Sequence, residues 1–352
     1  MKLLWAVDGW RAGNAYGMSV YRMKLKECVQ AAGVSVTTDP KDSHDLAIHV
    51  QLPNRFDPLP GDRNLLFTAT ELSEPLVWGE NVGEAAVLVV PCEQSRLACL
   101  DYFTGPIEVC PLGIDPELFP FYQRRKPAPD EPFRFLFVGN DINKSSRKGF
   151  QILLDAWRDW FRTGRMPSNV ELYVKTSDFP GPEVQVFNLP TGRMTLDTRN
   201  LNVRELVSLY NSAHAFLFPS QGEGWGLTLT DAMATGAPCA WTAWSAMLDY
   251  ADARIGFPLT EFRMSPMRWR CPQDDPGANE KIAYGAEVSI PHFIQRMEEL
   301  YHNYPAALAL GKAASERMHS RYTWAHAARK FVEICERALE LPVLAEPARA
   351  KC

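Results

Sequence analysis

A glycine-rich turn between a predicted strand and a predicted helix constrains this chain more than any other feature. It lies in residues 218–240, FPSQGEGWGLTLTDAMATGAPCA, where three glycines surround the single carboxylate of Glu223. The apolar run 215–218 predicts a buried strand before the turn, and the spacing of apolar residues over 227–234 predicts a helix after it. Glycines let backbone N–H groups approach a ligand closely, and a helix N-terminus attracts an anion. The segment therefore predicts a site for a phosphorylated sugar compound, with the carboxylate placed to hold sugar hydroxyls.

This segment resembles the donor-binding segment of the retaining glycosyltransferases of GT-B fold in family four, whose pattern is PS..EGFG...LEAMA.G.PV. Glu223 matches the first of two family carboxylates, and Asp231 stands at the second, where the family usually has Glu. The resemblance implies a catalytic role for Glu223, on the donor hydroxyls, and ribose binding by Asp231. It also implies that the donor lies against the intervening residues Gly224, Trp225, Gly226 and Leu227.

Asp231 has a second possible role, because Thr228-x-x-Asp231 approximates a capping box. In that case its carboxylate serves the start of the helix. Asp is one methylene shorter than Glu, so the Asp231 carboxylate reaches less far toward a ribose than the family's Glu would. This shorter reach is an argument against ribose binding. The sequence leaves both roles open.

The sequence FLFVGNDINKSSRKGF resembles the family's strand, GR turn and KG helix start. Lys148 matches the lysine that pairs with the donor diphosphate, and Gly139 and Asn140 fall on the turn. Asn140 stands where the family frequently has arginine, so one positive charge that would bind the donor phosphate is missing there. Arg147 or Lys144 is the candidate to replace it.

The N-terminal part offers acceptor-side candidates. Gly13 and Gly17 lie in AGNAYGMSVY after the first predicted strand, which resembles the family's loop facing donor phosphate and acceptor. A plain strand-to-helix turn is the alternative. Glu71, in TATELSEPLVW, stands where a subgroup carries a Glu-containing turn, which implies a second catalytic candidate; a surface glutamate is the alternative.

The alternation of strand-like and helical segments predicts an α/β protein with two Rossmann-like domains facing across a cleft. We expect an acceptor-side domain over 1–125, a charged, proline-rich linker over 126–132 and a donor-binding domain over 133–320. The segment 321–341 resembles the family's last helix, which crosses back to the first domain, and 342–352 is a tail. Residues 261–286 lack periodicity and predict an inserted loop, and the arginines and lysine at 124–126 predict a solvated hinge.

Composition narrows the class. The net charge of −5 argues against a general nucleic-acid binder, and no apolar run approaches the length that spans a bilayer. The eight cysteines form no CxxC spacing, which favours reduced thiols and a reducing, cytoplasmic compartment. The seven histidines share no ligand spacing, so we expect no metal site and no cofactor besides a nucleotide-sugar co-substrate.

Together these features predict a retaining, metal-independent glycosyltransferase that uses a UDP- or GDP-sugar. A glycan or glycolipid hydroxyl is the expected acceptor, with peripheral membrane contact possible and a modified nucleic-acid base as an alternative. A sugar-nucleotide epimerase of the same fold and a catalytically silent sugar-nucleotide-binding protein remain as other readings, because a fold does not fix its chemistry. Asn140 and Asp231, which depart from the family pattern, favour the silent form.

Overall fold

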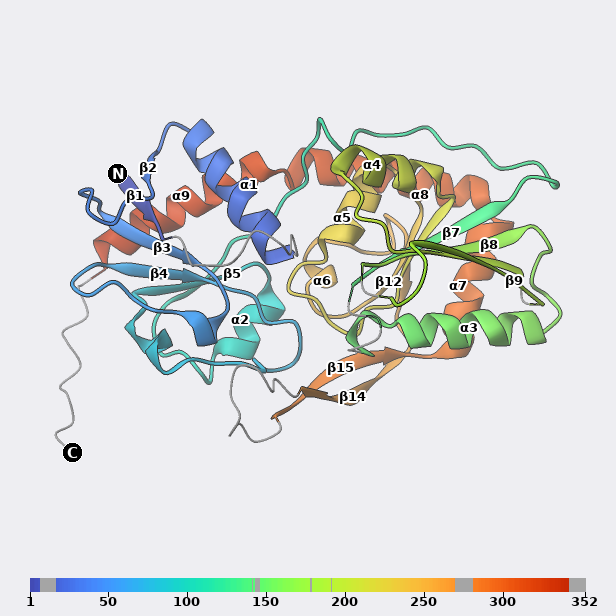
Figure 1. Cartoon of the computed structure of the whole chain (residues 1–352), viewed down its shortest axis with the longest axis horizontal. Helices are drawn as coiled ribbons and strands as arrows, with labels where there is room; N and C mark the ends of the chain where they lie inside the picture. The colour runs from blue at the N-terminus through green and yellow to red at the C-terminus, as the bar shows by residue number, and fades with distance from the viewer. Residues whose placement is uncertain are drawn as a thin grey trace. The chain divides into compact units, whose positions relative to one another are not determined.

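The chain folds into two compact units, each built on a β-sheet flanked by helices (Figure 1). The computed structural model describes residues 1–6, 17–140, 142, 146–177, 179–190, 192–269 and 281–341. The first unit comprises Met1–Gly113 and Trp324–Cys352, and the second comprises Ile114–Thr323. The boundary expected at residue 125 and the linker expected after it therefore fall inside the second unit.

The first unit contains a six-stranded parallel sheet in the order β2-β1-β3-β4-β5-β6. Its elements are β1 (Lys2–Trp5), α1 (Gly17–Ala31), β2 (Ser35–Thr37), β3 (Leu46–Val50), β4 (Asn64–Phe67), β5 (Val87–Val90), α2 (Glu93–Cys99), β6 (Ile107–Val109) and α9 (Trp324–Glu340), with 3-10 turns at Pro53–Arg55 and Glu80–Glu84. The strands β3, β4 and β5 are short, mostly apolar runs that are buried along their whole length, as expected for a sheet covered on both faces.

Consecutive residues of β4 pack on opposite faces of this sheet. Phe67 packs against Tyr21 of α1, with ring centroids 5.3 Å apart, and against Phe331 of α9, at 5.9 Å. Leu66 points the other way, into a cluster with Phe103 near the end of α2. The C-terminal helix α9 is thus part of the core of the first unit.

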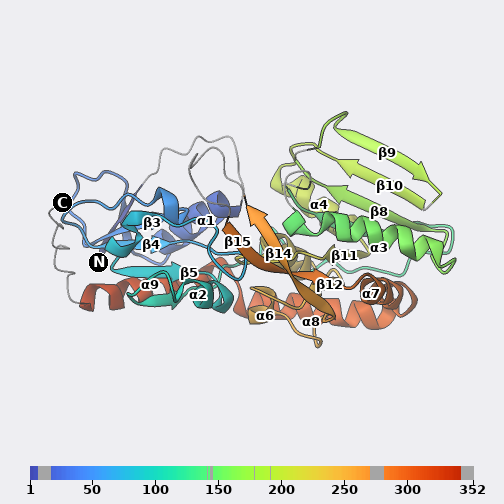
Figure 2. The same cartoon turned by 90° about the horizontal axis from the view of Figure 1, so that it is seen from below.

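The second unit contains a seven-stranded sheet in the order β13-β12-β11-β7-β8-β10-β9, in which β9 alone is antiparallel to its neighbour. Its strands are β7 (Phe133–Val138), β8 (Val170–Lys175), β9 (Val184–Leu189), β10 (Gly192–Asp197), β11 (Ala215–Phe218), β12 (Cys239–Thr242) and β13 (Phe257–Leu259). Its helices are α3 (Phe150–Arg162), α4 (Val203–Ser212), α5 (Leu227–Ala234), α6 (Met247–Tyr250), α7 (Ile290–His302) and α8 (Tyr304–Arg321), with a 3-10 turn at Ser146–Lys148. Figure 2 shows β9 as the outermost strand of this sheet.

Strand register places helices on both faces of this sheet as well. Phe135 of β7 contacts Trp157 and Trp160 of α3, with ring centroids 5.9 and 6.0 Å away. Phe216 of β11 pairs with the residue after Phe135 and so faces the opposite side, where Tyr210 of α4 lies 5.8 Å from it. Ligands of such sheets bind at the carboxyl ends of the parallel strands, and the loops that follow these strands line that edge.

The loop expected at 261–286 is wrong, because this segment contains a two-stranded antiparallel sheet. Strands β14 (Phe262–Trp269) and β15 (Lys281–Val288) pair along their whole length, and Met267 and Ala283 are buried on one face. Pro266 and Gly285 interrupt the strand pattern in the sequence. A two-stranded ribbon tolerates proline because each of its strands is an edge. The two strands pair with each other across a gap in the sequence, and neither shows a periodic pattern of apolar residues that would have predicted it.

The solvated hinge expected at Arg124 is also wrong, because this side chain is 5% exposed. Its guanidinium donates to the carbonyls of Ala213 (2.9 Å), Tyr210 (2.9 Å) and Thr235 (2.6 Å). These carbonyls end helices α4 and α5, where the helix dipoles are negative. Burial lowers the pKa of Arg124 to about 10, so the group stays charged at neutral pH. A cation that the sequence places in a polar segment thus joins two helix ends.

Replacing Arg124 by methionine should destabilise the second unit. The substitution keeps most of the aliphatic packing but leaves buried carbonyls without donors, which costs roughly 1–3 kcal/mol. Urea unfolding followed by far-UV circular dichroism measures the loss. The control is Arg125→Met, because Arg125 is an exposed neighbour paired with Glu131. An unchanged midpoint for Arg124→Met would show that water replaces the guanidinium without loss.

Three further observations concern the described residues only. The cysteines at positions 28, 92, 99, 110, 239 and 335 are free thiols. No described helix combines the length and apolar character needed to cross a membrane. No group of three or more His, Cys, Asp or Glu side chains is arranged to hold a metal ion in the part of the chain that the structure describes.

Candidate active site

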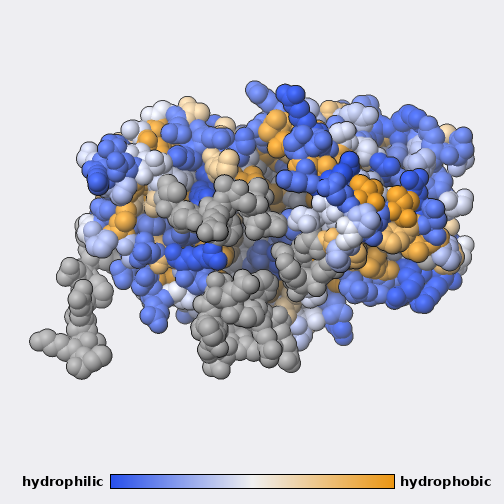
Figure 3. All heavy atoms as spheres, in the orientation of Figure 1, coloured by the Kyte–Doolittle hydropathy of each residue, from blue (hydrophilic) through white to orange (hydrophobic). Residues whose placement is uncertain are grey.

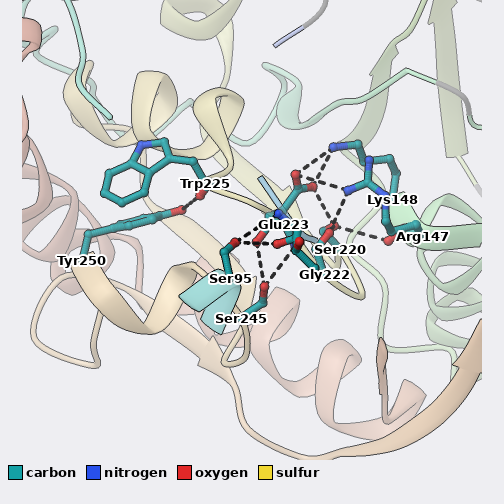
Figure 4. Close-up of polar contacts among 10 residues, drawn as sticks. Ser95, Arg147, Lys148, Ser220, Gly222, Glu223, Trp225, Ser245 and Tyr250 are labelled. Atoms are coloured by element: carbon teal, nitrogen blue, oxygen red, sulfur yellow. Dashed lines mark hydrogen bonds and ion pairs between the residues drawn. The ribbon is translucent and has the colours of Figure 1, made fainter. Parts of the chain in front are cut away.

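Glu223 is the centre of a buried polar cluster in the loop between β11 and α5 (Figure 4). Its side chain is 5% exposed, yet both carboxylate oxygens accept hydrogen bonds from Lys148 Nζ, at 2.7 and 2.9 Å. Ser220 Oγ donates to Oε1 at 2.7 Å. The glycine turn and the KG motif, which the sequence predicted to share a site, are therefore in direct contact.

Arg147 adds a second cation to this cluster. Its Nη1 lies 3.4 Å from Glu223 Oε2 and donates to the carbonyl of Gly222 at 2.8 Å. Burial alone would raise the pKa of Glu223, but the charges of Lys148 and Arg147 and the hydrogen bonds from Lys148 and Ser220 outweigh it and lower the pKa. The carboxylate is therefore ionised at neutral pH, and two cations face one anion.

Ser245 fixes the backbone of Glu223. Its hydroxyl donates to the Glu223 carbonyl at 2.7 Å and accepts from the Glu223 N–H at 3.2 Å. Ser245 itself has a φ of 60°, a conformation that non-glycine residues rarely adopt and that is often found at functional sites. One side chain thus binds both backbone polar groups of Glu223.

Two helices begin at this cluster with glycine as the N-cap. Gly149 precedes α3 with a φ of +72°, and Gly226 precedes α5 with a φ of +91°. A β-carbon at Gly149 would collide with the carbonyl oxygen of Pro219, so only glycine lets the KG turn approach the β11 loop this closely. Neither helix has a side-chain hydrogen bond at its cap. Their first N–H groups are therefore not occupied by capping side chains and favour an anion.

Trp225 supports the loop with its side chain instead of contributing it to the cluster. Figure 4 shows its indole directed toward Tyr250, away from the Glu223 carboxylate. The rings of Trp225 and Tyr250 lie 4.9 Å apart, and the Tyr250 hydroxyl donates to the Trp225 carbonyl at 3.0 Å. Trp225 can therefore offer a ligand its backbone, and Leu227, two residues further on, is the first residue of α5.

Gly139 and Asn140 follow β7, the strand beside β11. The Gly139 N–H donates to the carbonyl of Lys175 at 3.0 Å, and a β-carbon at Gly139 would lie 3.7 Å from Lys148 Cβ. Asn140 is half-buried at the bend. The turn expected to face the phosphate is thus adjacent to Lys148, while Lys144, the other candidate cation, lies outside the described residues.

Asp231 does not cap α5, so that alternative is wrong. The helix begins at Leu227 with Gly226 as its N-cap, which places Asp231 beyond the first turn. Burial raises the pKa of Asp231 well above its usual value, and the Asp115 carboxylate adds to the effect. A partly buried carboxylate with a nearby like charge and no capping function is a candidate for a ligand contact.

The acceptor-side candidates belong to the first unit. Glu71 lies half-buried after β4, the preceding Thr70 carbonyl accepts from Ser95 Oγ at 2.6 Å, and Gly17 is the first residue of α1. Gly13 lies outside the described residues. The described structure thus brings Glu223, Lys148 and the glycine loop together, and places Glu71 and Gly17 in the other unit.

Sequence reasoning missed Ser220 and Ser245 as members of the site. Ser220 falls within the PS part of the family pattern, so it carried a signal that was read only as the end of a strand. Ser245 follows β12, and no local pattern links it to a loop 22 positions earlier. It joins the site only because β11 and β12 are neighbours in the sheet.

The sequence of residues 99–331 matches the family described as "Family 4 Glycosyltransferase in conflict systems". This match covers well over half of the chain. The chain belongs to this family 4 of glycosyltransferases. No curated protein sequence matches it.

Solved structures confirm the fold of this glycosyltransferase. Sucrose-phosphate synthase from Thermosynechococcus elongatus is similar over 96% of this chain and 99% of its own, with a TM-score of 0.65 and 16% identity. Anabaena Alr3699/HepE in complex with UDP and glucose is similar over 96% and 100%, with a TM-score of 0.62 and 12% identity. WaaG, a glycosyltransferase involved in lipopolysaccharide biosynthesis, is similar over 94% and 99%, with a TM-score of 0.58 and 15% identity. The glycosyltransferase therefore has the predicted GT-B fold, and its activity is transfer of a glycosyl group.

Proposed function

We propose that this glycosyltransferase moves a hexose from a UDP- or GDP-sugar to an acceptor hydroxyl, with retention of configuration and without a bound metal. The observation that carries the proposal is the cluster of one buried carboxylate and two cations beside two glycine-capped helix starts. A nucleoside diphosphate sugar has the matching chemistry, since its diphosphate seeks cations and N–H groups and its sugar offers hydroxyls. The structure of Alr3699/HepE in complex with UDP and glucose supports this donor class.

Lys148 and Arg147 stabilise the charge that develops on the departing diphosphate. An ammonium has three N–H donors, and Glu223 takes two of those of Lys148. The third, together with the N–H groups that open α3 and α5, binds phosphate oxygens. Groups already aimed at a developing charge need no reorganisation when the bond breaks, which is a large source of catalysis.

Glu223 orients the sugar by accepting hydrogen bonds from donor hydroxyls. Its ionised state suits this acceptor role. On the first unit, we propose that Glu71 and Gly17 serve the acceptor side. The acceptor is a glycan or glycolipid hydroxyl, and we expect the reaction in a reducing compartment such as the cytoplasm.

Donor binding and product stereochemistry test this function. Nucleotides that bind the native protein raise its melting temperature by mass action, so a screen of UDP, GDP, ADP and their sugars should identify one nucleotide. The matching labelled sugar should then be transferred, with the donor's anomeric configuration kept in the product by NMR and with activity unchanged in EDTA. An inverted product would refute retention, and metal-restored activity would refute metal independence. No shift with any nucleoside diphosphate would refute the donor class.

Asp231→Asn tests the proposed ribose contact. The amide keeps the size but cannot ionise, so above the raised pKa of Asp231 the nucleotide should bind the variant about tenfold more weakly, a loss of roughly 1.4 kcal/mol. Because the pKa of Asp231 is raised, this carboxyl should ionise as the pH rises, and the wild type should then bind the nucleotide more strongly. The variant, which cannot ionise at this position, should show no such gain. Calorimetry over a pH series measures both. The 2′-deoxy nucleotide should bind the two proteins alike; an equal loss with it would place Asp231 away from the ribose.

A further inference from the structure

The edge of the seven-stranded sheet carries a strand that nothing in the described chain covers. Strand β9 pairs with β10 on one side and ends the sheet on the other. It reads VQVFNL and holds no charged residue. Native proteins usually protect such an edge with a charge, a bulge or a proline within the strand. No such protection occurs between 184 and 189.

The pairing with β10 shows which backbone groups of β9 point outward. The Thr198 N–H donates to the Glu183 carbonyl at 2.7 Å, so these directly opposed residues form a hydrogen-bonded pair. In an antiparallel ladder such pairs alternate along the strand. With the observed register, Gln185, Phe187 and Leu189 are bonded to β10. The N–H and C=O groups of Val184, Val186 and Asn188 therefore face away from the sheet.

The same part of the strand also exposes apolar side chains. Val184, Val186 and Leu189 are 43%, 47% and 43% exposed. Figure 3 shows apolar surface over the second unit in the region where Figure 1 draws β9. An edge with unpaired backbone groups and exposed β-branched residues is suited to another β-strand.

Prolines limit the register that this other strand can adopt. Pro182 and Pro190 flank the strand, each two positions beyond the last outward-facing residue, and have no N–H to donate. The outward donors of the segment are thus those of Val184, Val186 and Asn188, which are symmetric about Val186. A second β9 running antiparallel, with Val186 opposite Val186, pairs all three with their counterparts. It also sets proline opposite proline at both ends.

We propose that two copies of this chain associate through antiparallel pairing of their β9 strands, with the two-fold axis at Val186. Such an interface is isologous and closes as a dimer. The two sheets become one continuous sheet, and the exposed Val186 side chains of the two copies meet across the axis. Because β9 holds no charged residue, the pairing sets no like charges within this strand opposite each other.

Sedimentation velocity over a range of protein concentrations tests the association. The wild-type chain should show a monomer–dimer equilibrium. Val186→Lys places two ammonium groups face to face, and should raise the dimer dissociation constant at least about tenfold. Val203→Lys is the matched control, because Val203 is a valine of similar exposure, 46%, on α4 of the same unit. A monomer at every concentration, or equal effects of the two lysines, would overturn the proposal.

Thiol crosslinking tests the register. Two Val186→Cys chains would place their thiols directly opposite, whereas two Val184→Cys chains would place them about 14 Å apart along the ladder. A short bis-maleimide should therefore link Val186→Cys to itself, above the background of the unsubstituted protein. It should also link Val184→Cys to Asn188→Cys in a mixture, but neither to itself. Self-linking of Val184→Cys, or crosslinked species larger than dimers, would contradict a two-fold axis at Val186.

Discussion

Replacing Glu223 by glutamine should lower kcat for sugar transfer by about 10²- to 10³-fold, the usual effect of losing one preorganised polar group at a reacting centre. The amide keeps the size of the side chain and can still accept from Ser220 or Lys148, but it loses the charge that balances Lys148 and Arg147. Donor hydroxyls would then face a weaker acceptor. Binding of the nucleoside diphosphate should change by only a few fold, because the cations remain.

The matched control is Glu171→Gln. Glu171 is another buried glutamate of the second unit, paired with Arg134 at 2.6 Å. Its loss should affect stability but leave kcat unchanged. Steady-state kinetics, calorimetry with the nucleoside diphosphate and thermal melts separate the outcomes. A Glu223→Gln variant that loses nucleotide affinity as much as kcat, or that melts far below the control, would show that the carboxylate serves the fold or the nucleotide rather than the sugar.

Replacing Lys148 by alanine should weaken the nucleoside diphosphate by about 10- to 100-fold, since a hydrogen bond to a charged group contributes roughly 1.5–3 kcal/mol. The bare nucleoside should bind the variant and the wild type alike, because it has no phosphate for the ammonium to contact. Calorimetry with both ligands gives the comparison within one pair of proteins. An unchanged affinity for the diphosphate would remove Lys148 from the donor site.

The same substitution has a second, pH-dependent consequence. In the wild type the pKa of Glu223 is lowered, so its ionisation stabilises the native state above the unfolded-state pKa, and this contribution is lost as the pH falls through the folded pKa. Lys148 supplies the largest of the effects that lower it. Without Lys148, the gain in unfolding free energy between acidic and neutral pH should shrink. Urea unfolding at several pH values measures this; an undiminished gain would mean that Arg147 and Ser220 alone hold the carboxylate ionised.

Local sequence signals were sufficient where the chemistry is local. The apolar runs at β7 and β11 and the helical spacing of α3 and α5 predicted those elements, because strand and helix periods are properties of neighbouring residues. The glycine-rich segment that contains Gly226 predicted the turn before α5, since the backbone conformation at Gly226 admits little else. Local sequence patterns did not predict features whose interacting residues are far apart in the chain. The β14–β15 ribbon pairs strands across an 11-residue gap, and Arg124 reaches carbonyls 86 to 111 positions away.

The sequence by itself determined the two α/β sheets and the family, and it predicted Glu223 and Lys148 as site residues. The tertiary structure alone decided that these two side chains, 75 positions apart, form a buried ion pair. It also decided that Arg147 joins them and that Ser245 holds the loop. The reason is that parallel strands bring distant loops to one edge of a sheet, whereas charge balance and burial depend on which side chains meet there. The same dependence on tertiary structure removed the capping role of Asp231 and left β9 as an uncovered edge.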